Sequence, residues 1–147
     1  MEVDAGQLEL GGEHYAVAGE AVSARLDLSR TAAGYAARMR FLAHVSGPCM
    51  RCLEDADVPV EIDVREVDQP GTDDEELRSP YVDGDELEVG RWAHDALALA
   101  LPFQLLCRPD CKGLCPVCGV SLNDAGPNEH QHEKVPDPRW AKLRELG

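Results

Sequence analysis

Six cysteines in three close pairs constrain this chain more than any other feature of its sequence. Four of them follow one another at C-x3-C-x3-C-x2-C spacing, and a further C-x2-C pair lies upstream. A His-Gln-His triplet follows the last cysteine. Zinc prefers thiolate and imidazole ligands in tetrahedral sites, and C-x2–4-C pairs are typical of its ligands. The candidate metal ligands are Cys49, Cys52, Cys107, Cys111, Cys115, Cys118, His130 and His132.

These eight candidates are enough for one or two zinc ions, and the spacing allows two partitions. In the first, Cys49, Cys52, Cys107 and Cys111 hold one ion, while Cys115, Cys118, His130 and His132 hold a second. In the other, the four cysteines from Cys107 to Cys118 share one ion, and Cys49 and Cys52 are free thiols. Ligand pairs from separate segments close a tetrahedron with less strain than four ligands from one short run, which favours the first partition.

The cellular compartment supports metal over disulfides. The N-terminus lacks the basic and apolar regions of a signal peptide, and no apolar run is long enough to span a bilayer. We therefore expect a cytoplasmic protein, whose thiols stay reduced. An iron–sulfur cluster is disfavoured because the spacing does not match the usual ferredoxin runs. A redox dithiol at Cys49 and Cys52 is disfavoured because no βαβ pattern surrounds it.

Alternating apolar residues predict an antiparallel sheet. Residues 1–20 give only weak signals, because glycines interrupt any pattern. From Ala21 onward three stretches alternate with a period of two, which is typical of half-buried strands. Their predicted inward residues are Val22, Ala24, Leu26 and Leu28, then Ala37, Met39, Phe41, Ala43 and Val45, then Val58, Val60, Ile62 and Val64. Short connections between them predict a meander with one face on a core.

The second half of the chain changes character twice. Residues 66–88 are rich in Asp, Glu, Gly and Pro, which predicts a solvated loop, with an acidic docking surface as the alternative. Apolar residues then recur at spacings of three and four, which predicts an amphipathic helix over about 90–101. A short helix over Arg139–Leu146 is expected near the end. The predicted fold is α+β: a β-rich body over 1–106 and a zinc-stabilised Cys/His lobe over 107–147.

The charge limits the partners. A net charge of −14 repels phosphate backbones, so diffuse binding of nucleic acid is disfavoured and a basic protein is the expected direct contact. If RNA is touched locally, the candidates are Arg38, Arg40 and Arg51, which we expect near the corner between the second strand and the C-x2-C pair. No nucleophile–base pair, phosphate-binding glycine loop or carboxylate constellation stands out, so no enzyme is predicted.

Several motifs together resemble the YceD family, the large ribosomal RNA subunit accumulation proteins. They are Gly47-Pro-Cys-Met-Arg-Cys-Leu53, Leu97-Ala-Leu-Ala-Leu-Pro102, the CKGLCPxCG string that ends at Gly119, Leu122-Asn123, and Asp137-Pro-Arg-Trp-Ala-Lys-Leu143. The resemblance covers roughly residues 20–146. Many members have Cys-x-Cys where this chain has His130-Gln131-His132, and this exchange preserves zinc binding. Other relatives lack the CPxCG motif, which suggests that two sites would be separable.

The resemblance implies a non-enzymatic role in the synthesis, processing or stability of the large-subunit (23S) ribosomal RNA, and hence in ribosome assembly. The implied partners are a basic ribosomal protein or a pre-ribosomal particle, with no membrane and no small-molecule substrate. Two alternatives remain open. One is a thiol-based redox or zinc-responsive regulator that uses Cys49 and Cys52. The other is a zinc-dependent enzyme acting on RNA, which would need an open coordination position.

Overall fold

The computed structural model describes residues 1–19, 21–125 and 130–132. The chain forms two compact units, residues 1–111 and residues 112–147, so Cys107 and Cys111 lie with the strands rather than with the C-terminal lobe to which the sequence analysis assigned them. The predicted helix over Arg139–Leu146 falls outside the described residues.

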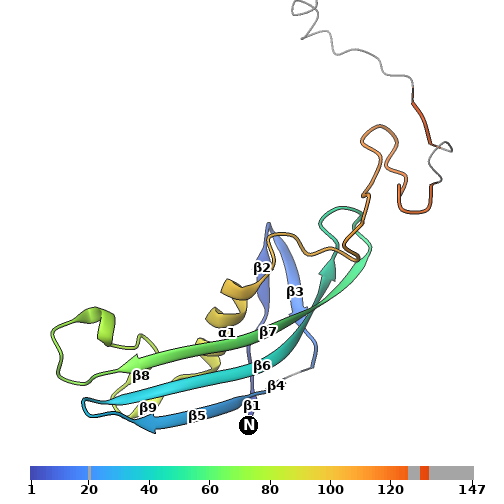
Figure 1. Ribbon diagram of the computed structural model, residues 1–147. Helices are drawn as coiled ribbons and strands as arrows, with labels where there is room; N and C mark the ends of the chain where they lie inside the picture. The colour runs from blue at the N-terminus through green and yellow to red at the C-terminus, as the bar shows by residue number, and fades with distance from the viewer. Residues whose placement is uncertain (20, 126–129, 133–147) are drawn as a thin grey trace, which may run out of the picture. The chain divides into compact units, whose positions relative to one another are not determined.

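An antiparallel meander forms the body of the first unit, as predicted (Figure 1). It consists of β5 (Arg25–Arg30), β6 (Tyr35–Pro48) and β7 (Asp55–Asp68). Strand β6 is central: it pairs with β7 over its whole length of 14 residues. Its other edge pairs with β5 at one end and with β3 (Glu13–Val17) at the other.

The alternation along β6 explains which face of the sheet is buried. Ala37, Met39, Phe41, Ala43 and Val45 are buried, and the residues between them are exposed or half-buried. Successive side chains of a strand point to opposite faces, so this pattern places one face of the sheet on the core. The predicted inward sets are confirmed except at Leu28, which is 64% exposed at the far end of β5.

Four short strands precede the meander, and sequence analysis missed three of them. They are β1 (Glu2–Val3), β2 (Leu8–Leu10), β3 and β4 (Val22–Ser23), of which β1 pairs with β4 and β2 with β3. The turn between β2 and β3 is Gly11-Gly12, with φ of +64° and +87°. Two-residue hairpin turns require positive φ, so the glycines that obscure the sequence pattern are what this turn needs.

The acidic segment 66–88 is more ordered than the solvated loop that its composition predicts. Strand β7 continues through Asp68, and a 3-10 helix, η1 (Glu75–Leu77), and a hairpin of β8 (Val82–Asp83) and β9 (Glu86–Leu87) follow. Asp68 is 5% exposed and accepts hydrogen bonds from the Ser79 N–H at 3.2 Å and from Arg78 Nε at 3.4 Å. The high content of Asp and Glu in this segment gives no sign of these contacts in the sequence.

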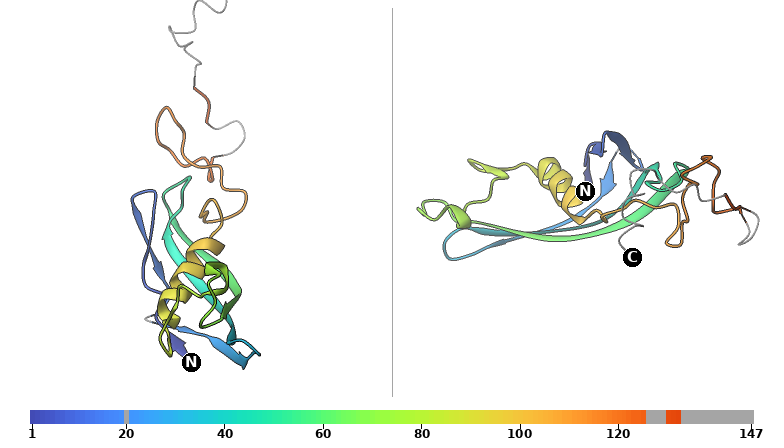
Figure 2. Two further views of the ribbon diagram at one scale, coloured as in Figure 1. Left: turned by 90° about the vertical axis from the view of Figure 1, so that its left-hand side faces the viewer. Right: turned by 90° about the horizontal axis from the view of Figure 1, so that it is seen from above.

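The amphipathic helix is confirmed as α1 (Val89–Ala100). It lies against one face of the sheet (Figure 2). Its buried residues are Trp92, Ala93, Ala96 and Leu97. Pro102 follows closely and disfavours helical backbone in the residue before it, which fits the end of the helix at Ala100. Within the described residues, no helix has both the length and the apolar character needed to cross a membrane.

Replacing Leu97 by alanine tests the packing of α1. Leu97 is fully buried, with 0% exposure, so Leu97→Ala should lower the free energy of unfolding by about 2–5 kcal/mol. Leu99→Ala on the same helix is the matched control, because Leu99 is 87% exposed and its loss should change little. Urea unfolding of both variants measures the difference. Equal losses would contradict this placement of the helix.

Candidate metal centres

The first cluster joins the turn between β6 and β7 to the segment that follows α1. Cys49 and Cys52 come from the turn, and Cys107 and Cys111 from the segment. The four sulfurs lie within 4.8 Å of one another, with 3.8 Å between the Sγ atoms of Cys49 and Cys111 and 3.5 Å between those of Cys52 and Cys107. All four are in the thiol form, and Cys49, Cys52 and Cys111 are buried.

Hydrogen bonds that do not involve the cysteine sulfurs also join these two segments. Met50 N–H donates to the Leu105 carbonyl at 2.9 Å, and Leu105 is itself part of the core. The Arg51 guanidinium donates to the Cys111 carbonyl at 2.9 Å and to the Gln104 side chain at 3.1 Å. Polypeptide contacts therefore help to position the four thiols.

The second cluster lies within the second unit. It consists of Cys115, Cys118, His130 and His132, whose ligand atoms also lie within 4.8 Å of one another. Cys118 Sγ is 3.4 Å from His130 Nε2, and the Nε2 atoms of His130 and His132 are 2.9 Å apart. A short hairpin-like segment presents the cysteines, with Leu114 bridged to Ser121 and the Leu122 N–H bonded to the Gly113 carbonyl at 2.8 Å.

The two C-x2-C turns have the same backbone pattern. In the first, Leu53 N–H donates to the Cys49 carbonyl at 3.0 Å, and Cys49 N–H donates to the Glu54 carbonyl at 2.7 Å. In the second, Gly119 N–H donates to the Cys115 carbonyl, and Cys115 N–H to the Val120 carbonyl, both at 2.8 Å. The residue after each second cysteine has positive φ, +63° at Leu53 and +74° at Gly119. Glycine occupies this position in the second turn, whereas leucine occupies it in the first.

The environment of each cluster favours one ionised thiol. Burial on its own raises the pKa of Cys49, but hydrogen bonds from backbone N–H groups, those of Cys107 and Cys52 foremost, lower that pKa to about 6. In the second cluster, the hydrogen bond with His130, ahead of that from the Val117 N–H, lowers the pKa of Cys115 to about 6. Burial and the neighbouring sulfurs raise the pKa of Cys107 to about 12. The thiolate is the form that binds metals.

The distances in the first cluster suit a tetrahedral metal ion. Zn–S bonds of about 2.3 Å place neighbouring sulfurs of a tetrahedron roughly 3.8 Å apart. The observed separations of 3.5 and 3.8 Å are close to that value. The structure thus places the eight candidate ligands in two groups of four. This grouping is the first of the two partitions that the spacing allowed. Metal binding itself stays a prediction.

The three candidate RNA-binding arginines do not cluster as expected. Arg38 donates to Asp63 at 2.7 Å, and Arg40 pairs with Asp27, so carboxylates occupy both guanidinium groups. Arg40 also lies eight residues along β6 from Pro48, which is roughly 26 Å in an extended strand, whereas Arg51 lies beyond Pro48. The length of β6 therefore separates Arg38 and Arg40 from Arg51. An RNA contact through them stays a prediction.

Comparison with known proteins identifies relatives. A family profile described as "Large ribosomal RNA subunit accumulation protein YceD" matches residues 37–147. The chain is 41% identical over 105 residues to an uncharacterised protein of Mycobacterium tuberculosis, covering 68% of this chain and 49% of that protein. A Mycobacterium leprae protein is 33% identical over 105 residues, covering 67% of this chain and 46% of its own length.

A maize relative carries a functional name. The "Large ribosomal RNA subunit accumulation protein YCED homolog 1, chloroplastic" of Zea mays is 36% identical over 77 residues, covering 52% of this chain and 22% of the maize protein. The chain thus spans about half the length of the mycobacterial relatives it matches, or less, and under a quarter of the maize protein. No solved structure matches the chain.

The positive φ of Leu53 generates a stability prediction. A non-glycine residue in the left-handed region costs about 1–2 kcal/mol, and Leu53, at 68% exposure, gains little from burial. Leu53→Gly should therefore raise the free energy of unfolding by roughly 1 kcal/mol. The reverse change at the equivalent position, Gly119→Leu, should lower it.

Leu42→Gly is the matched control, because Leu42 is also exposed, at 51%, but lies within β6 without positive φ. Glycine there should destabilise by roughly 0.5–1 kcal/mol. Chemical denaturation at one metal concentration compares the three variants. Destabilisation by Leu53→Gly would show that the side chain, and not the backbone, governs this turn.

Proposed function

The chain belongs to the YceD family, and on that premise we propose that it is a non-enzymatic factor in the synthesis, processing or stability of 23S ribosomal RNA, and hence in assembly of the large subunit. The match over residues 37–147 carries this proposal, together with the name of the maize relative. That name describes accumulation of an RNA and not a reaction. A role in ribosome assembly would place the chain in the cytoplasm, as the sequence analysis predicts.

Within this role we assign the two clusters to structural zinc, one ion in each. Four protein ligands fill a tetrahedral coordination sphere, which is the composition of structural rather than catalytic zinc sites. A set of four cysteines and a set of two cysteines with two histidines both belong to that structural class. An RNA-cleaving zinc enzyme would need a ligand position for water, and neither set leaves one. Zinc bound by the first set would link the β6–β7 turn to the segment after α1.

The thiol-switch alternative is less well supported. Cys49 and Cys52, the two thiols of this alternative, are 0% and 4% exposed, and oxidants reach buried thiols slowly. Both also lie within a four-sulfur group rather than in an isolated dithiol. A structural role explains the burial of both residues more directly.

The partner in this proposal is a basic ribosomal protein or a pre-ribosomal particle. A chain with a net charge of −14 attracts basic proteins and is repelled by bare RNA. Any contact with ribosomal RNA would then pass through a basic protein or through a local patch of arginines.

Native mass spectrometry of protein purified without added metal tests the zinc assignment. We expect two zinc ions in the wild type and one in each of two double variants, Cys49→Ser with Cys52→Ser, and Cys115→Ser with Cys118→Ser. Met50→Ser is the control, because Met50 lies between Cys49 and Cys52 in the sequence but is not one of the four ligands. A single zinc ion in the wild type that the Cys49→Ser, Cys52→Ser variant retains would favour the alternative partition, and metal-free wild type would refute the assignment.

Deletion of the gene from host cells tests the proposed function. We expect the ratio of mature large-subunit to small-subunit ribosomal RNA to fall, and large subunits to decrease on sucrose gradients. Wild type and Leu99→Ala should restore both quantities, whereas the Cys49→Ser, Cys52→Ser variant should restore them only in part. An unchanged ratio in the deletion strain would refute a role in RNA accumulation.

A further inference from the structure

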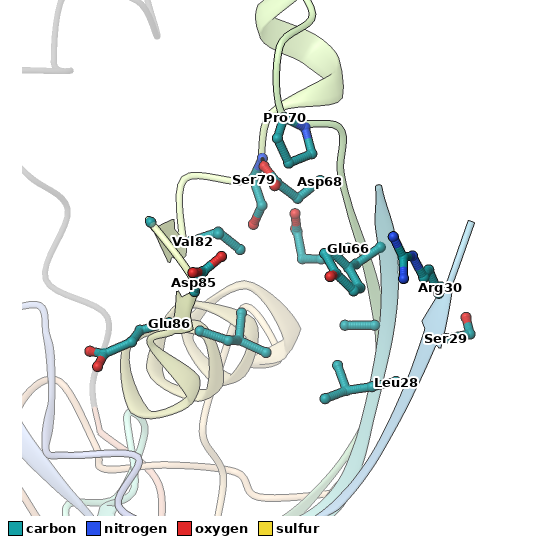
Figure 3. Close-up of a pocket in the computed structure, with 14 residues that line it drawn as sticks. Leu28, Ser29, Arg30, Glu66, Asp68, Pro70, Ser79, Val82, Asp85 and Glu86 are labelled. Carbon is teal, nitrogen blue, oxygen red and sulfur yellow. Dashed lines mark hydrogen bonds between the residues drawn. The ribbon is translucent and has the colours of Figure 1, made fainter. Parts of the chain in front are cut away.

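A groove lies at the end of the meander away from the cysteine turn. The ends of β5 and β7 and the start of β6 line one side, and the β8–β9 hairpin lines the other. Its volume is about 660 Å³, within the range of roughly 300–1,000 Å³ typical of ligand sites. Figure 3 shows Leu28 and Glu66 on the strand side, Val82 and Asp85 on the hairpin side, and Asp68 beside Ser79.

The groove is strongly acidic. Four carboxylates line it, those of Glu66, Asp68, Asp85 and Glu86, against a single guanidinium, that of Arg30. Asp68 is buried and already bound by Arg78 and Ser79. Across the described part of the chain, the other three carboxylates take part in no salt bridge. Three negative charges are therefore available to a ligand.

Apolar side chains lie among these charges. Leu28 and Tyr35, which line the groove, are 64% and 53% exposed, and Val82 and Leu87 are half-buried. A groove that combines carboxylates with apolar surface suits the side chains of arginine and lysine, whose long stems pack on apolar groups while the charged end pairs with carboxylates.

We propose that this groove binds an arginine- or lysine-bearing segment of a basic protein partner. The proposal rests on the proposed function, because it gives the chemistry by which an assembly factor of this acidity would hold a basic ribosomal protein. The same charges repel an RNA backbone. The acidic run Asp73–Glu76 offers charge without a groove, since its residues are exposed and none of them lines the cavity.

Fluorescence anisotropy with a labelled peptide of alternating arginine and leucine tests the binding. The groove variant combines Glu66→Gln, Asp85→Asn and Glu86→Gln. The control combines Glu9→Gln, Glu13→Gln and Glu61→Gln, which are exposed carboxylates outside the groove. Both change the net charge from −14 to −11, so they differ only in where charge is lost.

We expect the groove variant to raise the peptide Kd about tenfold, which is what three exposed ion pairs of ordinary strength contribute. The control should raise it by less than about threefold, because distant charges are screened. A peptide with citrulline in place of arginine should bind the wild type as weakly as the arginine peptide binds the groove variant. Tyr35→Ala should also weaken binding through loss of apolar contact, with charge unchanged.

Carbodiimide cross-linking locates the contact independently of affinity. With a lysine–leucine peptide, the wild type should form bonds from Glu66, Asp85 or Glu86 to lysine, identified by mass spectrometry. Cross-links confined to Asp73–Glu76, or equal Kd values for the groove and control variants, would overturn the groove proposal and leave the role in RNA accumulation standing. Conversely, an unaltered RNA ratio in the deletion strain would refute the role in RNA accumulation. The peptide-binding assay would still test the groove, because it does not depend on that ratio.

Discussion

The 14-residue pairing of β6 with β7 is the interaction on which the rest of the first unit depends. Its register sets which side chains face the core, because a shift by one residue would turn Met39, Phe41 and Val45 toward solvent. The same ladder has the cysteine turn at one end and the acidic groove at the other. Two regions of different chemistry are thus held by one continuous pair of strands.

Local patterns in the sequence were sufficient to predict the meander and the helix, because the residues that each buries recur at a regular period. They failed where a contact joins distant segments. Spacing left two ligand partitions open, since only the folded chain brings Cys49 within 3.8 Å of Cys111. The strands before residue 20 are too short to show a period, and Leu53 adopts positive φ without the glycine that usually marks it. The acidic groove combines side chains of five strands, so no single stretch of sequence reveals it.

Charge is distributed unevenly over the sheet of the first unit. On the face opposite the core, Arg38 and Arg40 are neutralised by the carboxylates of neighbouring strands. These cross-strand pairs reduce the positive charge that Arg38 and Arg40 offer to phosphate groups. In the groove, by contrast, carboxylates outnumber the cation, and among the residues that the structure describes only Asp68 of these carboxylates takes part in a salt bridge. This uncompensated negative charge is the basis of the proposed contact with a basic partner.

The two ligand sets differ in how much chain they enclose, and this difference affects the order of folding. Cys49 and Cys111 are 62 positions apart, whereas Cys118 and His130 are 12 apart. Closing the longer loop costs about 1.5 kcal/mol more chain entropy, if both loops are treated as flexible. The second set can assemble from one short local segment, whereas the first must wait until β6, β7 and α1 have been synthesised and brought together. The first cluster would therefore assemble late in folding, when the first unit is nearly complete.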